Sequence, residues 1–129
     1  LSYSNFGSSI GEDAEKMAEA AKILHMDYPD LIVDGEIQAN FAINQELLGE
    51  SYPFSMLHKR RVNTLIFPNL AAGNISYKLL KEMGGIEVHG PVLLGMKKSV
   101  HILQQGSTAN EIVDMVRLAV VDAQNKSKS

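Results

Sequence analysis

Three polar turns of the chain carry residue types that can hold an anion. Each turn follows an apolar segment and leads into a helix-like pattern. The candidate ligand-binding residues are Ser4, Gly7, Ser8 and Ser9 in the first turn, Asn69 and Asn74 in the second, and Gln105, Gly106 and Ser107 in the third. Hydroxyl and amide groups, together with the unpaired backbone N–H groups at a helix start, can bind a phosphate or a carboxylate. No Lys or Arg stands between Lys98 and Arg117, so the third turn supplies no positive charge of its own.

The same turns also have purely structural interpretations. Ser9 with Glu12, and Thr108 with Glu111, have the spacing of a capping box, in which two side chains satisfy the first N–H groups of a helix. Asn74 has the residue type of an ordinary helix N-cap. A cap and an anion site can coexist in one turn, so both interpretations stay open. Glu111 has a structural role before any catalytic one.

Paired carboxylates and histidines are the other residues that could hold a metal. Asp34 and Glu36 are two residues apart, so on a strand they would leave the same face and could bind a metal or act as an acid/base pair. No His lies near them, and a turn-and-cap role at a strand end is favoured. Metal-ligand spacing is lacking among all four histidines: His25, His58, His89 and His101. The sequence therefore predicts no metal site.

The sequence "HKRR" at residues 58–61 is the one concentrated basic segment. It could meet the phosphates of a nucleotide-like ligand, although an exposed basic patch on a loop is the commoner outcome. The remaining basic residues are scattered, and twelve basic against fifteen acidic side chains leave a formal charge of −3. Nucleic acid is therefore not an expected partner.

The elements that must position these turns follow from periodicity. Helical spacing of apolar residues predicts helices at about residues 14–24, 39–48, 74–83 and 109–124, with Gly84 and Gly85 ending the third. Short apolar runs predict strands at residues 31–33, 64–67, 92–94 and 100–103. Such alternation predicts an α/β fold in which helices flank both faces of a mainly parallel sheet, a three-layer α/β/α arrangement. Residues 49–61 should form a long connection, and the tail at 125–129 should be flexible.

Length and composition set the outer bounds. The 129 residues, 45% of them hydrophobic, can bury one core, so one domain or a large part of one is expected. The absence of cysteine excludes disulfides and thiolate catalysis and suits a reducing cytoplasm, the predicted location. No apolar run reaches membrane-spanning length, and we expect no membrane partner. Because the chain starts at Leu1 within a strand ending, we expect it to begin inside a longer polypeptide.

Four blocks follow one another along the chain: "PDLIVDGEIQANFAI", "VNTLIFPNLAAGNISYKLL", "GPVLLGMKKSVHIL" and "EIVDMVRLAVVDAQ". In this order they resemble the carboxy-terminal part of the phosphate acetyltransferase and butyryltransferase family. Within this family, "LSYSNFGSS", "YPFSML" and "GPVLLGM" followed by "VHIL" are similar to the transferase-like region fused behind the catalytic part of bacterial NADP-dependent malic enzymes. The resemblance implies an isocitrate/isopropylmalate dehydrogenase-like fold of two halves, with coenzyme A and acyl phosphate meeting in the cleft between them. Residues 1–129 would supply the later half.

The resemblance also implies roles for the third turn. In active transferases the residues that match Gln104, Gln105 and Gly106 usually read Ser-Arg-Gly, and an Asp matches Glu111. The Arg is thought to hold the phosphate, and the Asp to help deprotonate the coenzyme A thiol. Gln105 donates hydrogen bonds but brings no charge, and loss of one such contact typically costs on the order of a hundredfold in rate. Glu111 could still act as a base, although its extra methylene moves the carboxylate.

Three functions are compatible with this pattern. The resemblance implies a regulatory and oligomerisation region that binds acetyl-CoA or a related acyl-CoA and has lost efficient transfer. NADP, malate and a divalent metal would then bind only in a catalytic part outside these residues, and the protein would form a homo-oligomer. The second possibility is an active phosphate acetyltransferase, acting on an acyl-CoA and phosphate or on an acyl phosphate and coenzyme A. The third is a purely structural assembly module.

Overall fold

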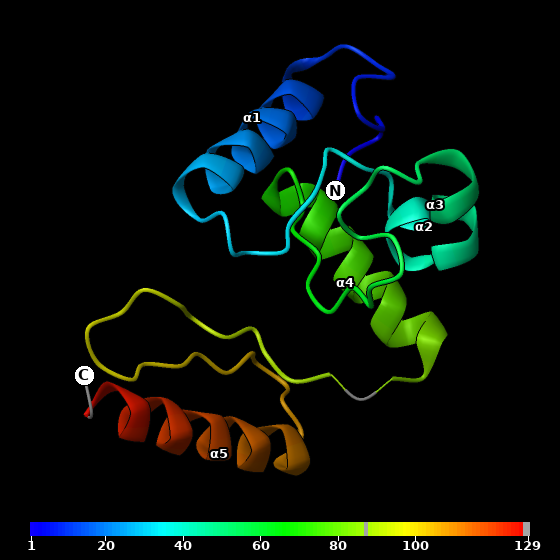
Figure 1. Ribbon diagram of the computed structural model, residues 1–129. Helices are drawn as coiled ribbons and strands as arrows, with labels where there is room; N and C mark the ends of the chain where they lie inside the picture. Colours follow the sequence, from blue (N-terminus) through cyan, green and yellow to red (C-terminus); the bar gives the residue numbers. More distant parts are fainter. Residues whose placement is uncertain (87, 128–129) are drawn as a thin grey trace. The chain divides into compact units, whose positions relative to one another are not determined.

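Helices are the regular elements of the described structure. The computed structural model describes residues 1–86 and 88–127, and it divides into two compact units, Leu1–Leu79 and Leu80–Ser129, here called unit 1 and unit 2. Within the described residues there are five helices: α1 (Glu12–Asp27), α2 (Ala39–Ile43), α3 (Gln45–Ser51), α4 (Leu70–Gly84) and α5 (Ala109–Lys126) (Figure 1). Unit 1 holds α1, α2 and α3, and unit 2 holds α5. Helix α4 contains the boundary between the units.

Helices α1 and α5 confirm the predictions from apolar spacing, and their starts differ in kind. Helix α5 begins with the predicted capping box, in which Thr108 Oγ1 accepts from Glu111 N and Glu111 Oε2 accepts from Thr108 N. The predicted box of Ser9 and Glu12 is wrong, because α1 begins two residues later with Gly11 at its N-cap and no side-chain cap. Acidic residues in the first turn of α1 instead stabilise the helix by interacting with the positive end of its dipole.

Two asparagines change the predicted helix boundaries. The helix expected over residues 39–48 is interrupted at Asn44, whose extended backbone ends α2 while its side chain accepts from Leu47 N and starts α3. Helix α4 starts at Leu70, four residues before the predicted start. Its cap is Asn69, whose Oδ1 accepts from Ala72 N at 2.9 Å, and the predicted capping role of Asn74 is therefore wrong.

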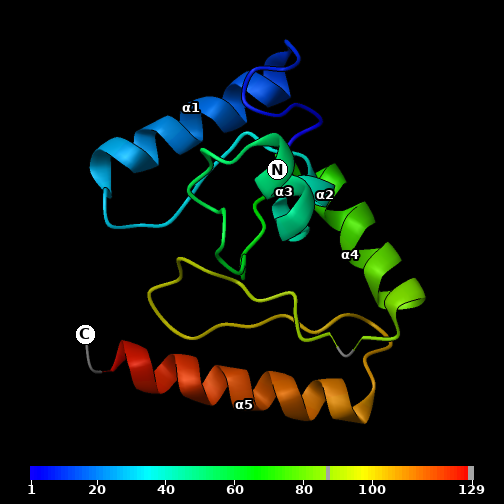
Figure 2. The same ribbon diagram turned by 45° about the vertical axis from the view of Figure 1, so that its right-hand side comes forward.

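None of the four segments predicted as strands is a β-strand among residues 1–86 and 88–127. A strand is defined by its hydrogen-bonded ladder with a neighbour, and these segments form no such ladder within the described residues. In unit 2, residues 88–108 run beside α5 in both views of the ribbon (Figures 1 and 2). The apolar residues of the two strands predicted there are partly to mostly exposed, with Leu94 at 83%. The parallel sheet stays a prediction.

The core of unit 1 holds the amino-terminal segment against α2 and α3. Ile37, Ala42 and Leu48 are buried, and five partly buried hydrophobic residues pack around them: Leu1, Phe6, Phe41, Tyr52 and Leu57. The ring of Tyr52 lies 5.1 Å from that of Phe6 and 5.1 Å from that of Phe41, centroid to centroid. In the described part of unit 2 only Met115 is a buried hydrophobic residue.

Among the described residues, no helix has the length and apolarity that crossing a membrane requires.

Candidate functional site

The first turn, residues 4–9, is organised around a carboxylate of the chain itself. Glu36 Oε1 accepts from Ser4 Oγ at 2.8 Å and from Gly7 N at 2.5 Å. Ser9 N in turn donates to Ser4 Oγ at 3.0 Å, and Gly7 has a φ of 86°, which favours glycine. Ser4 and Glu36 are both buried, at 0% and 4% exposure. An internal carboxylate therefore uses the hydroxyl and the N–H that the sequence suggested for an external anion.

Glu36 is held in its charged form. Burial alone would raise its pKa, but the hydrogen bonds from Gly7 and Ser4 outweigh this effect and leave the pKa below the ordinary value of 4.5. Ser8 and Ser9 lie at the exposed edge of the turn, where Ser8 Oγ accepts from Asn5 N at 2.8 Å. Ligand contacts for Ser4, Gly7, Ser8 and Ser9 stay predictions, with Ser8 and Ser9 the accessible members.

The second turn precedes α4 and is hydrogen-bonded to α1. Asn69 Oδ1 caps α4, and Asn69 Nδ2 donates to Asp13 Oδ2 at 2.9 Å, so both polar ends of this side chain have protein partners. Asp13 is also paired with Lys16 at 2.8 Å. Asn74 lies on the exposed surface of α4, one turn after Leu70. The hydrogen bond from Asn69 thus joins α1 to the start of α4 within unit 1, and a ligand contact by Asn69 or Asn74 stays a prediction.

The third turn, residues 104–107, is a tight reversal in unit 2 that leads into α5. Ser107 N and Ser107 Oγ both donate to Gln104 O, at 3.1 and 2.9 Å, and Gly106 has a φ of 91°. Gln104, Gln105 and Gly106 are exposed. The first backbone N–H groups of a helix have no partner within the helix, and in α5 the cap supplies a partner for only some of them. An exposed amide beside a helix start can bind an anion by hydrogen bonds, but it cannot neutralise the anion's charge.

Glu111 is fully engaged by its neighbours in unit 2. Its Oε1 accepts from Lys81 Nζ at 2.9 Å, and its Oε2 accepts from Thr108 N at 2.8 Å and Thr108 Oγ1 at 3.1 Å. Hydrogen bonds from the Thr108 backbone, the Lys81 ammonium and the Thr108 hydroxyl lower its pKa to about 2. A carboxylate with so low a pKa is a weak base, and the cap and the ion pair fix its position. The structure therefore gives Glu111 a structural role.

Metal-ligating residues are dispersed. Asp34 Oδ2 accepts from Ser55 Oγ and Met56 N, both at 2.8 Å, while Glu36 faces the first turn, so the two carboxylates serve different loops. Asp34 therefore has a structural role, but it holds a distant loop, and the described residues contain no strand end at which the predicted turn-and-cap role could act. His25 Nε2 lies 2.7 Å from Val33 O and His101 Nε2 lies 3.3 Å from Asp122 Oδ2. Residues 1–86 and 88–127 contain no group of three or more His, Asp or Glu side chains suited to a metal ion.

Two interactions were not foreseen from the sequence. The 2.8 Å hydrogen bond between Ser4 and Glu36 spans 32 positions, and the Lys81–Glu111 ion pair spans 30. The sequence singled out Ser4, Glu36 and Glu111, but no local signal pairs residues this far apart. Lys81 carried no signal beyond its place in a predicted helix. The structure gathers the residues of the first turn around Glu36, whereas the third turn belongs to a different unit.

Comparisons with known proteins define the family. Residues 1–120 match the family described as phosphate acetyl/butaryl transferase. The chain is 42% identical over 126 residues to an NADP-dependent malic enzyme of Haemophilus influenzae, a match that covers 98% of this chain and 16% of that protein. It is 37% identical over 124 residues to a phosphate acetyltransferase of Clostridium acetobutylicum, covering 96% of this chain and 37% of that protein.

A solved structure agrees with these relatives. A phosphotransacetylase from Streptococcus pyogenes matches with a TM-score of 0.86 at 36% identity, covering 100% of this chain and 38% of that one. The helices and connections described above thus share the fold of part of a phosphotransacetylase. The chain spans less than two fifths of the length of each of these three proteins. Family match, sequence identity and fold agree, and the chain belongs to the phosphate acetyl/butaryl transferase family.

Proposed function

We propose that this chain is a regulatory region of a malic enzyme that binds acetyl-CoA or a related acyl-CoA and transfers its acyl group poorly. The similarity to malic enzymes supports the parent activity, and membership of the transferase family supports a coenzyme A thioester as ligand. The candidate contacts in the first and third turns are the exposed residues Ser8, Ser9, Gln105 and Gly106, together with the half-buried Ser107.

The observation that carries this proposal is the chemistry at Gln105 and Glu111. An amide stands where the family usually has a guanidinium, so this position cannot neutralise a phosphate or the charge that develops in transfer. Glu111, with its pKa lowered to about 2 and both oxygens engaged, is a poor acceptor for the proton of a thiol whose ordinary pKa is about 8.5. Binding then remains feasible while turnover is slow.

Regulation requires that the ligand bind one state of the assembly better than another. In this proposal malate is oxidised and decarboxylated by a catalytic part outside these residues, where NADP and a divalent metal bind. The acyl-CoA bound here lowers that activity, and this region contributes to a homo-oligomer in the cytoplasm.

Calorimetric titration of the intact protein with acetyl-CoA tests the proposal, combined with an acetyl phosphate assay and a malate oxidation assay. We expect saturable acetyl-CoA binding, a fall in malate oxidation as the ligand saturates, and little acetyl phosphate. Rapid acetyl phosphate formation would contradict the proposal. Absence of thioester binding at millimolar ligand would instead favour a purely structural assembly module.

An active phosphate acetyltransferase is the second candidate. The 37% identity to the Clostridium acetobutylicum enzyme and the fold shared with a phosphotransacetylase favour it equally at the level of the family. In this alternative, an Arg from elsewhere in the protein supplies the charge that Gln105 lacks. Replacing Gln105 with Arg separates the two candidates. The rate of acyl transfer should rise strongly only if the missing charge at this position limits transfer, and it should not change if another Arg already supplies that charge.

A further inference from the structure

Unit 1 contains a pocket that none of the three turns contributes to. Its volume is about 380 Å³, and it is lined by Ile43, Gln45, Lys59, Arg60, Arg61 and Val62. This volume falls in the lower part of the range of small-molecule sites, which runs from about 300 to 1,000 Å³. Three of its six residues are basic, two are apolar and one is an amide. The basic segment singled out in the sequence therefore lines a concave surface.

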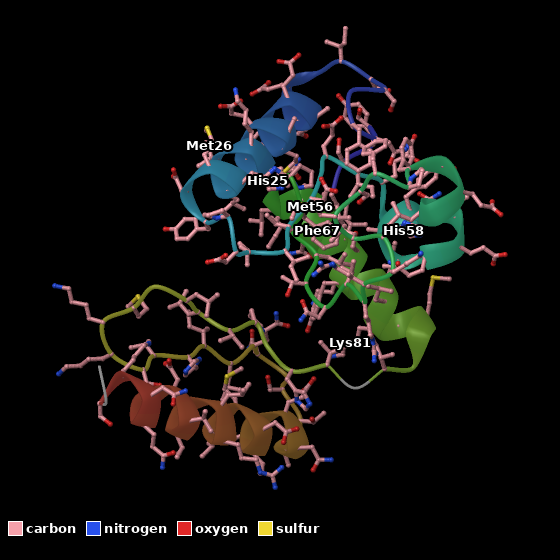
Figure 3. All side chains as sticks on the ribbon, in the orientation of Figure 1. His25, Met26, Met56, His58, Phe67 and Lys81 are labelled. Carbon is pink, nitrogen blue, oxygen red and sulfur yellow. The ribbon has the colours of Figure 1, made fainter. Side chains whose placement is uncertain are left out.

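The basic segment is held by a network of backbone and side-chain contacts. Asp34 Oδ2 accepts from Ser55 Oγ and Met56 N, which fixes the loop just before the segment. Further along, Arg60 N donates to Leu57 O at 3.0 Å. The His58 ring lies against α3, so close that a Cβ added at Gly49 would be 2.9 Å from His58 Nε2 (Figure 3). The backbone that carries the three cations is thus anchored before any ligand arrives.

The three cations have no acidic partner among residues 1–86 and 88–127. Within the part of the chain that the structure describes, neither Lys59 nor Arg60 nor Arg61 forms an ion pair with a carboxylate. Three adjacent positive charges repel one another, and a bound anion removes that repulsion. The planar fork of an Arg matches two oxygens of a phosphate, which an isolated ammonium does not.

Gln45 adds a second, independent observation. Its Oε1 is buried and has no hydrogen-bond partner within the described part of the chain, although it belongs to a residue that lines this pocket. A buried acceptor without a donor is unfavourable, so such atoms are usually satisfied by a partner. A ligand with an O–H or N–H group beside its phosphates would supply that donor.

We propose that this pocket binds a small diphosphate whose organic part carries a hydrogen-bond donor, of the class of a nucleoside diphosphate. Lys59, Arg60 and Arg61 hold the phosphates, Gln45 Oε1 accepts from the organic part, and Ile43 and Val62 supply apolar contact. The site is separate from the acyl-CoA contacts proposed above, and its existence does not depend on them.

Titration of the chain with pyrophosphate and with adenosine 5′-diphosphate tests the site. The double variant Arg60→Gln/Arg61→Gln should raise the Kd for both probes at least tenfold. The matched control Lys97→Gln/Lys98→Gln removes two exposed cations outside the pocket and should change the Kd less than twofold. Equal effects of the two double variants, or no saturable binding to the wild type, would overturn the proposal.

The role of Gln45 has its own readout. Wild type should bind adenosine 5′-diphosphate more tightly than pyrophosphate, and Gln45→Leu should remove that preference without weakening pyrophosphate binding. Equal affinities of wild type for the two probes would contradict a donor-bearing ligand. Acetyl-CoA also contains a diphosphate, so its binding must be distinguished from binding to this pocket. If the two sites are separate, the Arg60→Gln/Arg61→Gln variant should keep its acetyl-CoA affinity. Loss of acetyl-CoA binding in that variant would show that the pocket is not a separate site.

Discussion

Glu36 shows how a single residue can change the interpretation of a motif. The first turn has the hydroxyls, the glycine and the N–H groups of an anion site, yet Ser4 and Gly7 bind the carboxylate of Glu36. An internal anion fixes the backbone of residues 4–9, so Ser8 and Ser9 are presented at its edge without the loop having to order around a ligand. Glu36 is in this sense a positioning residue for the predicted contacts.

Replacing Glu36 with Gln should destabilise the chain at neutral pH by about 1 kcal/mol, because both hydrogen bonds lose their charge assistance. The folded-state pKa of Glu36 is lowered, so its contribution is fully present above the ordinary value of 4.5 and is lost as the pH falls through the lower folded value. Urea unfolding between pH 7 and pH 3 should therefore show a smaller acid-induced loss of stability in Glu36→Gln than in wild type. Glu50→Gln, at an exposed position, serves as the control. Identical pH profiles for wild type and Glu36→Gln would contradict this account.

The sequence predicts the residues of the first turn but not their pairing. Residue type and spacing single out Ser4, Gly7 and Glu36, and they favour a turn-and-cap role for Asp34 and Glu36. The pairing of Ser4 with Glu36 joins residues 32 apart, and it depends on how the chain folds over the core of Ile37, Ala42 and Leu48. Local patterns contain no information about such pairs.

At the scale of elements, the start of α5 links helix stability to the third turn. Replacing Thr108 with Ala should cost about 1 kcal/mol, because Glu111 N loses its cap and Glu111 Oε2 loses one donor. Thermal or urea unfolding measures this loss. Thr64→Ala, which removes only a contact with the adjacent Asn63, should change stability by less than about 0.5 kcal/mol. Equal effects of the two substitutions would mean that the cap contributes nothing.

Helix α3 offers a test of the packing behind the basic segment. Gly49→Ala would place a Cβ 2.9 Å from His58 Nε2, so the ring or the helix must shift, at a cost of about 1–3 kcal/mol that exceeds the helix-propensity gain of about 0.5–1 kcal/mol. Gly73→Ala is the matched control, because Gly73 lies in α4 and its added Cβ would meet Phe67, which precedes the helix, at an ordinary 3.7 Å. That substitution should stabilise the chain by about 0.5–1 kcal/mol through helix propensity. Unfolding midpoints that move in the same direction for both variants would contradict the close contact at His58.

The accuracy of the predicted elements follows from the range of the forces that form them. Helices α1 and α5 were predicted because apolar spacing and capping residues are local properties. The break at Asn44 was missed, since an Asn inside an otherwise helical pattern is commonly tolerated. The strand predictions rested on apolar runs, and a strand needs a partner that the run itself does not specify.

At the scale of the whole molecule, the chain keeps the family's fold, and the proposed loss of transfer depends on individual side chains. The fold agrees with that of a phosphotransacetylase at a TM-score of 0.86, and this match covers the whole chain, including the third turn. The proposed changes are chemical: the resemblance implies a guanidinium at the position of Gln105, where this chain has an amide, and the carboxylate of Glu111 is bound by Lys81 and Thr108. Binding and turnover are therefore expected to separate.

The rate of acetyl phosphate formation from acetyl-CoA and phosphate, compared between the intact wild-type protein and Gln105→Arg, tests this separation most directly. Restoring the charge should raise the rate at least tenfold, because one preorganised charged contact is typically worth a hundredfold or more. Acetyl-CoA affinity, measured by calorimetry in parallel, should change much less than the rate. Brisk transfer by the wild type that Gln105→Arg leaves unchanged would contradict the account.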